Sequence, residues 1–249
     1  MLKKKPLLTS PKGRNSFPLS YLFGLVCWLS SSSGRMGGAL ACALVLHPFG
    51  EVGGGLFAQT PYKSVKDTLL LKSKIDGMSK QTNTIESDFI QVKNLSMLSE
   101  KITSKGHFWF QKQNNLRWEY SEPYNYSIVI NKDKILIKDE NKVKKYDMNS
   151  NKVFKEINDI MISCVNGTVL NSNKFKILYF ENDKNFKLEL TPHDKAMKES
   201  LKKINMYFDK SVTSVIKLDM LEPGDDLTTI DFSNKKINAA ISPEIFMLK

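Results

Sequence analysis

The sequence predicts an α+β fold in which about eleven short antiparallel strands form one curled sheet with helices on its concave face. Apolar and polar residues alternate in short runs after residue 84, with connections of mostly two to five residues between the runs. Strands connected this closely pair with their neighbours in antiparallel fashion. Eleven such strands are too many for a flat open sheet, and two amphipathic segments remain to cover or plug its concave face.

Composition and charge indicate a globular protein without a nucleic-acid partner. The chain has 249 residues, 41% hydrophobic and 25% charged, which excludes wholesale disorder and a coiled coil. Residues 1–58 hold 6 of the 37 basic and 1 of the 26 acidic residues, so the remainder carries 31 − 25 = +6 of the formal net charge of +11. A charge of this size supports solubility and is too small for a nucleic-acid footprint.

Residues 1–58 are predicted to be a signal or leader segment. Five positive charges within the first 14 residues precede two apolar runs, 17–29 and 36–48. Each run is too short to span a hydrocarbon core of about 30 Å comfortably, and Ala58 offers a small residue at a cleavage site. We therefore expect the mature chain, 59–249, to be a single soluble domain outside the cytoplasm.

Three alternatives for the leader remain open. Met36 could be the true start, or the segment could stay attached as a membrane anchor. Cys42 follows Ala39-Leu40-Ala41, a weak match to a lipidation site. In the last two cases the protein would be attached to a membrane.

The first helix is predicted from Ser64 to about Gln81. Thr68, Leu71, Ile75 and Met78 recur at three- and four-residue spacing, as on one face of a helix. The period then changes to two, which predicts six strands: Ile85–Val92, Ile102–Phe110, Leu116–Tyr120, Tyr126–Ile130, Lys134–Lys138 and Lys142–Met148.

A second helix is predicted from a continuous apolar stripe at helical spacing over residues 153–165. Ser150 or Asn151 would cap its start, and Gly167 would end it. Five further strands and a short turn of helix at 242–248 follow; the strands are Phe175–Phe180, Phe186–Leu190, Ile204–Phe208, Val215–Leu221 and Leu227–Phe232.

The sequence contains no pattern that predicts catalysis, and we expect no enzyme, cofactor or metal site. It has no glycine-rich phosphate loop after a strand, and no G-x-S-x-G, H-E-x-x-H or C-x-x-C motif. Cys164 lies on the apolar stripe and is predicted to be a small buried residue. His107 and His193 are far apart in sequence, and the carboxylate pairs Asp139-Glu140 and Asp225-Asp226 fall in predicted turns.

Aromatic residues are the one conspicuous feature. After residue 58 there are ten Phe, seven Tyr and two Trp, and the densest cluster is Phe108, Trp109, Phe110, Trp118, Tyr120, Tyr124 and Tyr126. The cluster fits a large apolar pocket for a greasy ligand. It also fits the packed interior of a barrel, which composition alone favours.

The residues of this region resemble the LolA family, the outer-membrane lipoprotein carriers of Gram-negative bacteria. The matching pattern is Phe89-x-Gln91, then Gly106-His107-Phe108-Trp109-Phe110, then Leu116-Arg117-Trp118-Glu119-Tyr120 and Pro123. The resemblance covers residues 62–247 in organisation, including 226–232, Asn238 and Phe246, with strong motif support in 85–123. It implies an incomplete eleven-strand barrel closed by helices.

The resemblance implies a periplasmic chaperone that makes and breaks no bond. Such a carrier, expected to be monomeric, would accept an acylated lipoprotein from an inner-membrane lipoprotein-releasing ABC transporter. It would shield the acyl chains and deliver the lipoprotein to an outer-membrane acceptor or to the outer membrane itself. The expected acyl-binding residues are Phe89, Phe108, Phe110, Leu116, Trp118 and Tyr120, and the expected underside of the lid helix, residues 153–165, is Ile157, Ile160, Met161 and Val165.

One position departs from the family pattern. Where family members commonly have an arginine that is thought to hold the lid shut, this chain has Lys112. Lysine keeps the charge but loses the planar fork that can bond several carbonyls. The same scaffold also fits two other functions, an outer-membrane-anchored lipoprotein acceptor and a general lipid-binding or sensing module.

Overall fold

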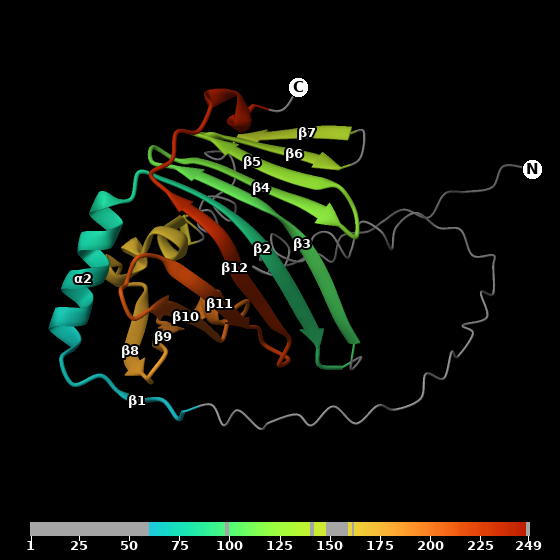
Figure 1. Cartoon of the computed structure of the whole chain (residues 1–249). Helices are drawn as coiled ribbons and strands as arrows, with labels where there is room; N and C mark the ends of the chain where they lie inside the picture. Colours follow the sequence, from blue (N-terminus) through green and yellow to red (C-terminus); the bar gives the residue numbers. More distant parts are fainter. Residues whose placement is uncertain (1–59, 98–99, 140–141, 148–158, 161, 248–249) are drawn as a thin grey trace, which may run out of the picture.

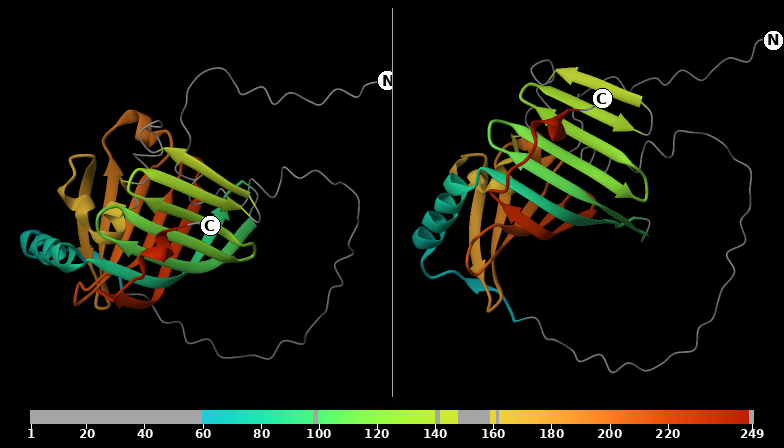
Figure 2. Two further views of the ribbon diagram at one scale, coloured as in Figure 1. Left: turned by 90° about the horizontal axis from the view of Figure 1, so that it is seen from above. Right: turned by 45° about the horizontal axis from the view of Figure 1, so that its top comes forward.

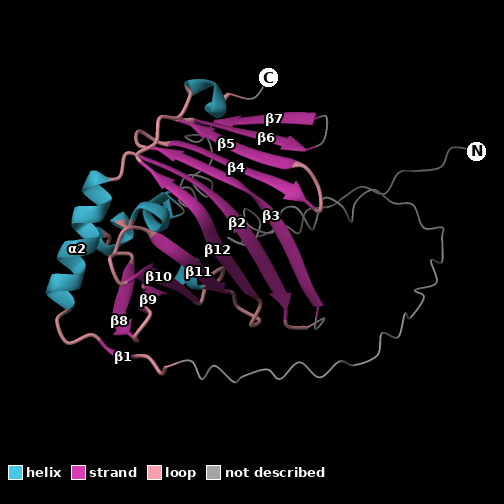
Figure 3. Cartoon of the chain, in the orientation of Figure 1, coloured by secondary structure: helices cyan, strands magenta, loops and turns pink. Residues whose placement is uncertain are grey.

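The computed structural model of the chain describes residues 60–97, 100–139, 142–147, 159–160 and 162–247. These residues form one twelve-stranded antiparallel sheet with a few helices (Figures 1 and 3). The predicted leader, 1–58, and most of the predicted lid helix lie outside the described residues. No helix in the described ranges is long and apolar enough to cross a bilayer.

All eleven predicted strands are present, with slightly different ends. The strands are β2 (Thr84–Leu95), β3 (Glu100–Gln111), β4 (Asn115–Glu122), β5 (Tyr126–Asn131), β6 (Lys134–Asp139), β7 (Lys142–Asp147), β8 (Phe175–Glu181), β9 (Asn185–Pro192), β10 (Lys203–Asp209), β11 (Val215–Leu221) and β12 (Leu227–Ile237). A twelfth strand, β1 (Lys63–Ser64), was not predicted, because two residues are too few to show alternation.

The helical elements with described bounds are α2 (Thr68–Gln81), α4 (Lys195–Lys198) and two 3-10 helices, η2 (Thr168–Asn171) and η3 (Pro243–Phe246). Residues 159–160 and 162–166 are also helical. Of these elements, η3 confirms the predicted turn near the C-terminus. One turn of helix has too little periodicity to be detected, so α4 was not predicted.

The strand order shows how the sheet stays open. It runs β1-β8-β9-β10-β11-β12-β2-β3-β4-β5-β6-β7, with every neighbouring pair antiparallel. Strand β12 pairs with β2, so the two halves of the chain meet in the middle of the sheet, and β1 and β7 form its edges. Figure 2 shows the curvature of this sheet, which is not closed into a barrel. The predicted incomplete, curled antiparallel sheet is confirmed.

Helix α2 begins four residues later than predicted. Asp67 caps it, accepting a hydrogen bond from the backbone nitrogen of Leu70 at 2.8 Å. The residues before this cap pair with the edge of β8, where Lys63 lies opposite Glu181. Thr68 is therefore exposed at the start of the helix, whereas Leu71, Ile75 and Met78 are buried as predicted.

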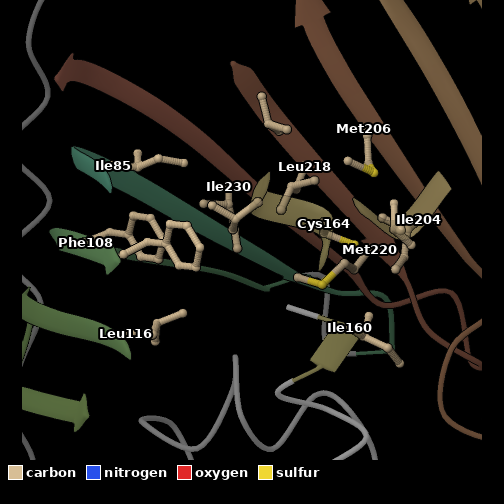
Figure 4. Packing of buried hydrophobic residues seen from close by; sticks show 14 of the residues in the cluster. Ile85, Phe108, Leu116, Ile160, Cys164, Ile204, Met206, Leu218, Met220 and Ile230 are labelled. Atoms are coloured by element: carbon tan, nitrogen blue, oxygen red, sulfur yellow. The ribbon is translucent and has the colours of Figure 1, made fainter. Parts of the chain in front are cut away.

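The connection between β7 and β8 has a special position in this topology. Because β7 is one edge of the sheet and β8 is next to the other, this connection has to reach from one edge to the other. Its described helical residues, 159–160 and 162–166, are part of the predicted lid helix. Among them, Ile160, Cys164 and Val165 belong to the buried core. Figure 4 shows Ile160 and Cys164 within this core. A helix over the concave face was the sequence prediction, and the structure confirms it.

Candidate functional site

The six residues predicted to bind acyl chains lie together in the core on β2, β3 and β4. The strand register places Phe108 opposite Trp118 and Phe110 opposite Leu116. At most 1% of the surface of each is exposed; the set is Phe89, Phe108, Phe110, Leu116, Trp118 and Tyr120. Figure 4 shows Phe108 and Leu116 facing the interior. In this structure the six residues are packed core.

The second half of the sheet completes this inner surface. Alternate residues of β10, β11 and β12 are buried in the same cluster; they are Ile204, Met206, Phe208, Leu218, Met220 and Ile230. Sequence reasoning assigned these strands but not their inner faces. The alternation of apolar residues along each strand was the signal that could have identified them.

Gly106 explains how the aromatic residues fit together. It lies opposite Phe89 in the sheet, and a β-carbon built on it would fall 2.6 Å from Phe89 Cζ and 1.9 Å from the carbonyl oxygen of Glu119. The missing side chain therefore makes room for the Phe89 ring, whose centroid is 4.6 Å from that of Trp118 and 5.2 Å from that of Tyr120. The glycine of the motif is a packing requirement of this cluster.

Several polar groups on the inner side of the sheet are hydrogen-bonded. Tyr120 Oη donates to Gln91 Oε1 at 3.1 Å, and Lys235 Nζ donates to Ser214 Oγ at 2.6 Å. Burial lowers the pKa of Lys235. Because these polar groups have partners, they can lie beside an apolar interior without the cost of an unsatisfied buried group.

The described residues of the lid helix pack into the interior. Ile160 and Val165 are 4% and 5% exposed, and Val165 lies beside Phe108 and Phe232 at a residual cavity of about 10 Å³. A cavity of that size holds one water molecule at most. An acyl chain does not fit into this cavity. Two of the four predicted lid residues, Ile157 and Met161, lie outside the described residues.

Cys164 is part of the same apolar surface. It is 3% exposed, and burial raises the pKa of its thiol to about 12. A thiol held protonated in this way is a poor nucleophile. The structure supports the prediction that Cys164 is a small buried side chain.

Lys112 contacts α2. Its Nζ donates to the backbone oxygen of Lys80 at 2.6 Å, and its backbone nitrogen donates to the oxygen of Asn83 at 2.8 Å. Asn238 acts at the same end of α2, donating to the oxygen of Gln81 at 3.0 Å. Lys112 thus holds the last turn of α2, and its predicted action as a latch on the lid helix stays a prediction.

Arg117 of the motif and Asn131 at the end of β5 bind the C-terminal segment. Leu116, Trp118 and Tyr120 point into the core, whereas Arg117 Nη1 donates to the backbone oxygen of Ile245 at 3.1 Å. Asn131 Nδ2 donates to the oxygen of Phe246, also at 3.1 Å. One strand of the motif therefore builds the core with one face and holds η3 with the other.

The remaining titratable residues form ordinary polar contacts. His107 Nδ1 lies 2.6 Å from Asp88 Oδ1, and the His107 ring contacts that of Trp109 in a tilted arrangement, with centroids 4.1 Å apart. Asp225 forms an ion pair with Lys202 in an exposed turn. Within the part of the chain that the structure describes, no three His, Cys, Asp or Glu side chains form a group that could hold a metal ion.

A larger, polar pocket of about 340 Å³ lies outside this core. It is lined by Tyr62 near the start of the described chain, the β8–β9 turn, and residues of β10 to β12 including Tyr207 and Asp231. Tyr207 Oη donates to Asp219 at 2.8 Å, and burial is the main cause of the raised pKa of Tyr207. The polar lining of this pocket is unsuited to acyl chains.

The architecture is an open antiparallel sheet whose apolar inner face packs against helices. A family described as "Outer membrane lipoprotein carrier protein LolA" matches residues 80–249. Since this match covers more than half of the chain, the chain belongs to the LolA family.

Solved structures of similar fold are distant in sequence. A LolA superfamily protein from Nitrosomonas europaea is 10% identical, with 71% of this chain and 97% of that chain covered, at a TM-score of 0.39. A putative outer membrane lipoprotein-sorting protein domain from Vibrio parahaemolyticus is 10% identical (70% and 95% covered, TM-score 0.37), and LprF from Mycobacterium bovis is 12% identical (72% and 97% covered, TM-score 0.38). None of the curated proteins matches. The family assignment rests on the family match alone.

Proposed function

We propose that this protein is a periplasmic chaperone that shields the acyl chains of lipoproteins and carries them from the inner to the outer membrane. The family match supports this proposal. The observation that carries it is the large apolar face of the sheet, covered by the lid helix in the connection between the two ends of the sheet. Displacing that helix would expose both apolar surfaces together.

Transfer free energies explain why such a carrier is needed. Each methylene group moved from water into an apolar site gains about 0.8 kcal/mol. The acyl chains of a triacylated lipoprotein contain tens of methylenes and cannot cross an aqueous compartment exposed. The carrier must also release them, so it must not bind them better than a membrane does.

In this proposal, the buried lid residues allow the carrier both to bind acyl chains and to release them. Exposing an apolar side chain such as Ile160 or Val165 costs about 1.5–3 kcal/mol. Acyl chains that replace the helix would restore the apolar contacts of the sheet. The apolar contacts of the helix itself would stay lost. This cost lowers the net affinity and favours release.

Export and partners are part of the same proposal. Residues 1–58 would be removed as a signal segment, leaving the single domain 59–249. The inner-membrane ABC transporter would supply the lipoprotein, and an outer-membrane acceptor or the outer membrane would receive it. The protein would act without a cofactor and without catalysis.

Site-specific photocrosslinking tests the proposal. Phe232 is partly buried, and its ring centroid is 6.1 Å from that of Trp118, so a benzophenone side chain there would meet cargo in the interior. We expect crosslinks to acylated lipoproteins in cells. The matched control is the same label at Ile90, which is exposed on β2 and should give none.

The outcomes separate the alternatives. Crosslinks to free lipid but not to lipoprotein would favour a general lipid-binding module, and a diacylglyceryl group on Cys42 would favour an anchored acceptor. Absence of both lipid and lipoprotein crosslinks at Phe232 would contradict the proposal.

A further inference from the structure

Helix α2 presents two leucines to solvent. Leu69 is 79% exposed and Leu70 is 53% exposed, although leucine is among the residue types most often buried. Both lie on the first turn, and the buried face of the helix is formed by Leu71, Ile75 and Met78. In Figure 1, α2 lies at one end of the sheet, at the edge of the molecule.

The rest of the outer face of α2 is small or positively charged. Ser73 is exposed between the two leucines in helical projection, and a β-carbon added at Gly77 would meet nothing within 4 Å. Lys66, Lys74 and Lys80 are exposed around this face. We call Leu69, Leu70 and Ser73, with these three lysines, the α2 outer face.

The acidic residues of this helix are engaged with the fold. Asp67 accepts the capping hydrogen bond from Leu70, and Asp76 Oδ1 accepts from Asn171 Nδ2 at 3.1 Å. Both carboxylates keep their charge, so residues 66–80, with four lysines and two aspartates, carry a formal charge of 4 − 2 = +2. Exposed apolar side chains on a helix surrounded by lysines are typical of segments that lie in the interface of an anionic bilayer.

We propose that the α2 outer face docks reversibly on the surface of an anionic phospholipid bilayer. Leu69 and Leu70 would enter the acyl boundary while the lysines contact the phosphate groups. A protein partner fits less well, because a stable protein–protein interface buries about 800 Å² on each side and two leucines supply a small part of that. This proposal does not depend on lipoprotein cargo.

A fluorophore on the helix tests the proposal in the full chain. Ser73→Cys would carry an NBD label, with Cys27 and Cys42 replaced by serine; Cys164 is buried and resists labelling. With phosphatidylglycerol vesicles we expect a blue shift and a gain in intensity, and with phosphatidylcholine vesicles a much weaker response. Raising salt from about 0.05 M to about 0.5 M should weaken the response.

Matched variants identify the residues responsible. Leu69→Ser with Leu70→Ser should reduce vesicle partitioning of the labelled chain about tenfold or more. Leu178→Ser on β8, where the leucine is 42% exposed, should change it little. An NBD label at Asn234, on β12, is the control for attachment of the chain through its leader alone. The fluorescence of this label should not change when vesicles are added.

Three results would overturn the proposal. They are no response of the label at position 73 to phosphatidylglycerol, an equal response to both lipids, and unchanged partitioning of the double leucine variant. A response at position 73 that requires a purified envelope protein in place of lipid would replace the bilayer with a protein partner. The vesicles contain no lipoprotein, so the result is independent of the photocrosslinking test at Phe232.

Discussion

At the scale of single residues, the aromatic cluster depends on one absent side chain. Gly106 and Phe89 face each other across β2 and β3, and the Phe89 ring occupies the space that a β-carbon would need. Trp118 and Tyr120 pack on the same ring. The motif glycine and the motif aromatics are therefore parts of one packing arrangement.

Gly106→Ala should destabilise the protein by about 1–3 kcal/mol or more, because the new methyl group overlaps a ring and a backbone oxygen. Urea denaturation gives the free energy of unfolding. Gly77→Ala is the matched control: its β-carbon meets nothing within 4 Å, and it should stabilise α2 by about 0.5–1 kcal/mol. Equal effects of the two substitutions would contradict the packing argument.

Loss of the hydroxyl group should change the free energy of unfolding differently at two neighbouring tyrosines, Tyr120 and Tyr126. Tyr120 Oη donates to Gln91, so Tyr120→Phe should cost about 1 kcal/mol. Tyr126 Oη is buried and has no hydrogen-bond partner among the residues that the structure describes, so Tyr126→Phe should be neutral or stabilising at pH 7. Urea denaturation of both variants measures the difference, and a loss at Tyr126 similar to that at Tyr120 would contradict it.

The alkaline pH dependence follows from the same burial. Burial, and to a smaller extent the charges of Asp139 and Tyr146, raises the pKa of Tyr126 above its usual value of 10.0. Above pH 10 the unfolded state loses the hydroxyl proton of Tyr126, whereas the folded state still holds it. The contribution of this group to the free energy of unfolding is therefore fully present below pH 10 and decreases as the pH rises above 10. Unfolding midpoints above pH 10 should fall less steeply in Tyr126→Phe than in the wild type.

At the scale of elements, the end of α2 is held by groups distant in sequence. Thr82 Oγ1 donates to the oxygen of Met78 at 2.8 Å, and Lys112 and Asn238 donate to the oxygens of Lys80 and Gln81. Carbonyl groups at the end of a helix have no partner within the helix, and cations are favourable there. Helix α2 is thereby joined to β3 and to the end of β12.

Lys112→Met should loosen the last turn of α2 without unfolding the protein. The expected result is faster amide hydrogen exchange in residues 78–84, and Lys112→Arg should restore slow exchange because arginine also donates to carbonyls. Lys80→Met is the control, because the bond uses the backbone oxygen of Lys80 and not its side chain. Unchanged exchange in Lys112→Met would show that this hydrogen bond does not hold the helix end.

At the scale of the whole molecule, strand order decides what can cover the interior. β7 and β8 lie near opposite edges of the sheet, and the described helical residues of the connection between them, 159–160 and 162–166, include Ile160, Cys164 and Val165 of the core. This helix can leave without breaking the pairing of the strands, because it contributes none of the pairing residues.

Loading with an acylated lipoprotein should therefore change the helix and not the sheet. We expect faster amide hydrogen exchange at residues 159–166 in the loaded protein, with exchange in β2, β3 and β4 unchanged or slower. Hydrogen exchange with mass spectrometry of the empty and loaded forms measures both. Equal protection of the helix in the two forms would show that acyl chains bind elsewhere.

The sequence by itself determined the strands, the approximate helices and the class of fold. Period-two alternation marks residues such as Phe108 and Phe110, and short polar turns force neighbouring strands to pair antiparallel. These are local properties, so they can be read along the chain. Of the predicted aromatic cluster, the structure buries Phe108, Phe110, Trp118, Tyr120 and Tyr126 together, whereas Trp109 lies beside His107 on the other face of β3 and Tyr124 is exposed.

Only the tertiary structure decided how that cluster is used. The pairing of β12 with β2, the contact of Lys112 with Lys80 and the hold of Arg117 on Ile245 join residues that are distant in sequence. Local periodicity carries no information about such partners. It also cannot tell a hollow interior from a filled one, because both require the same apolar faces. The structure places Ile160 and Val165 in the buried core.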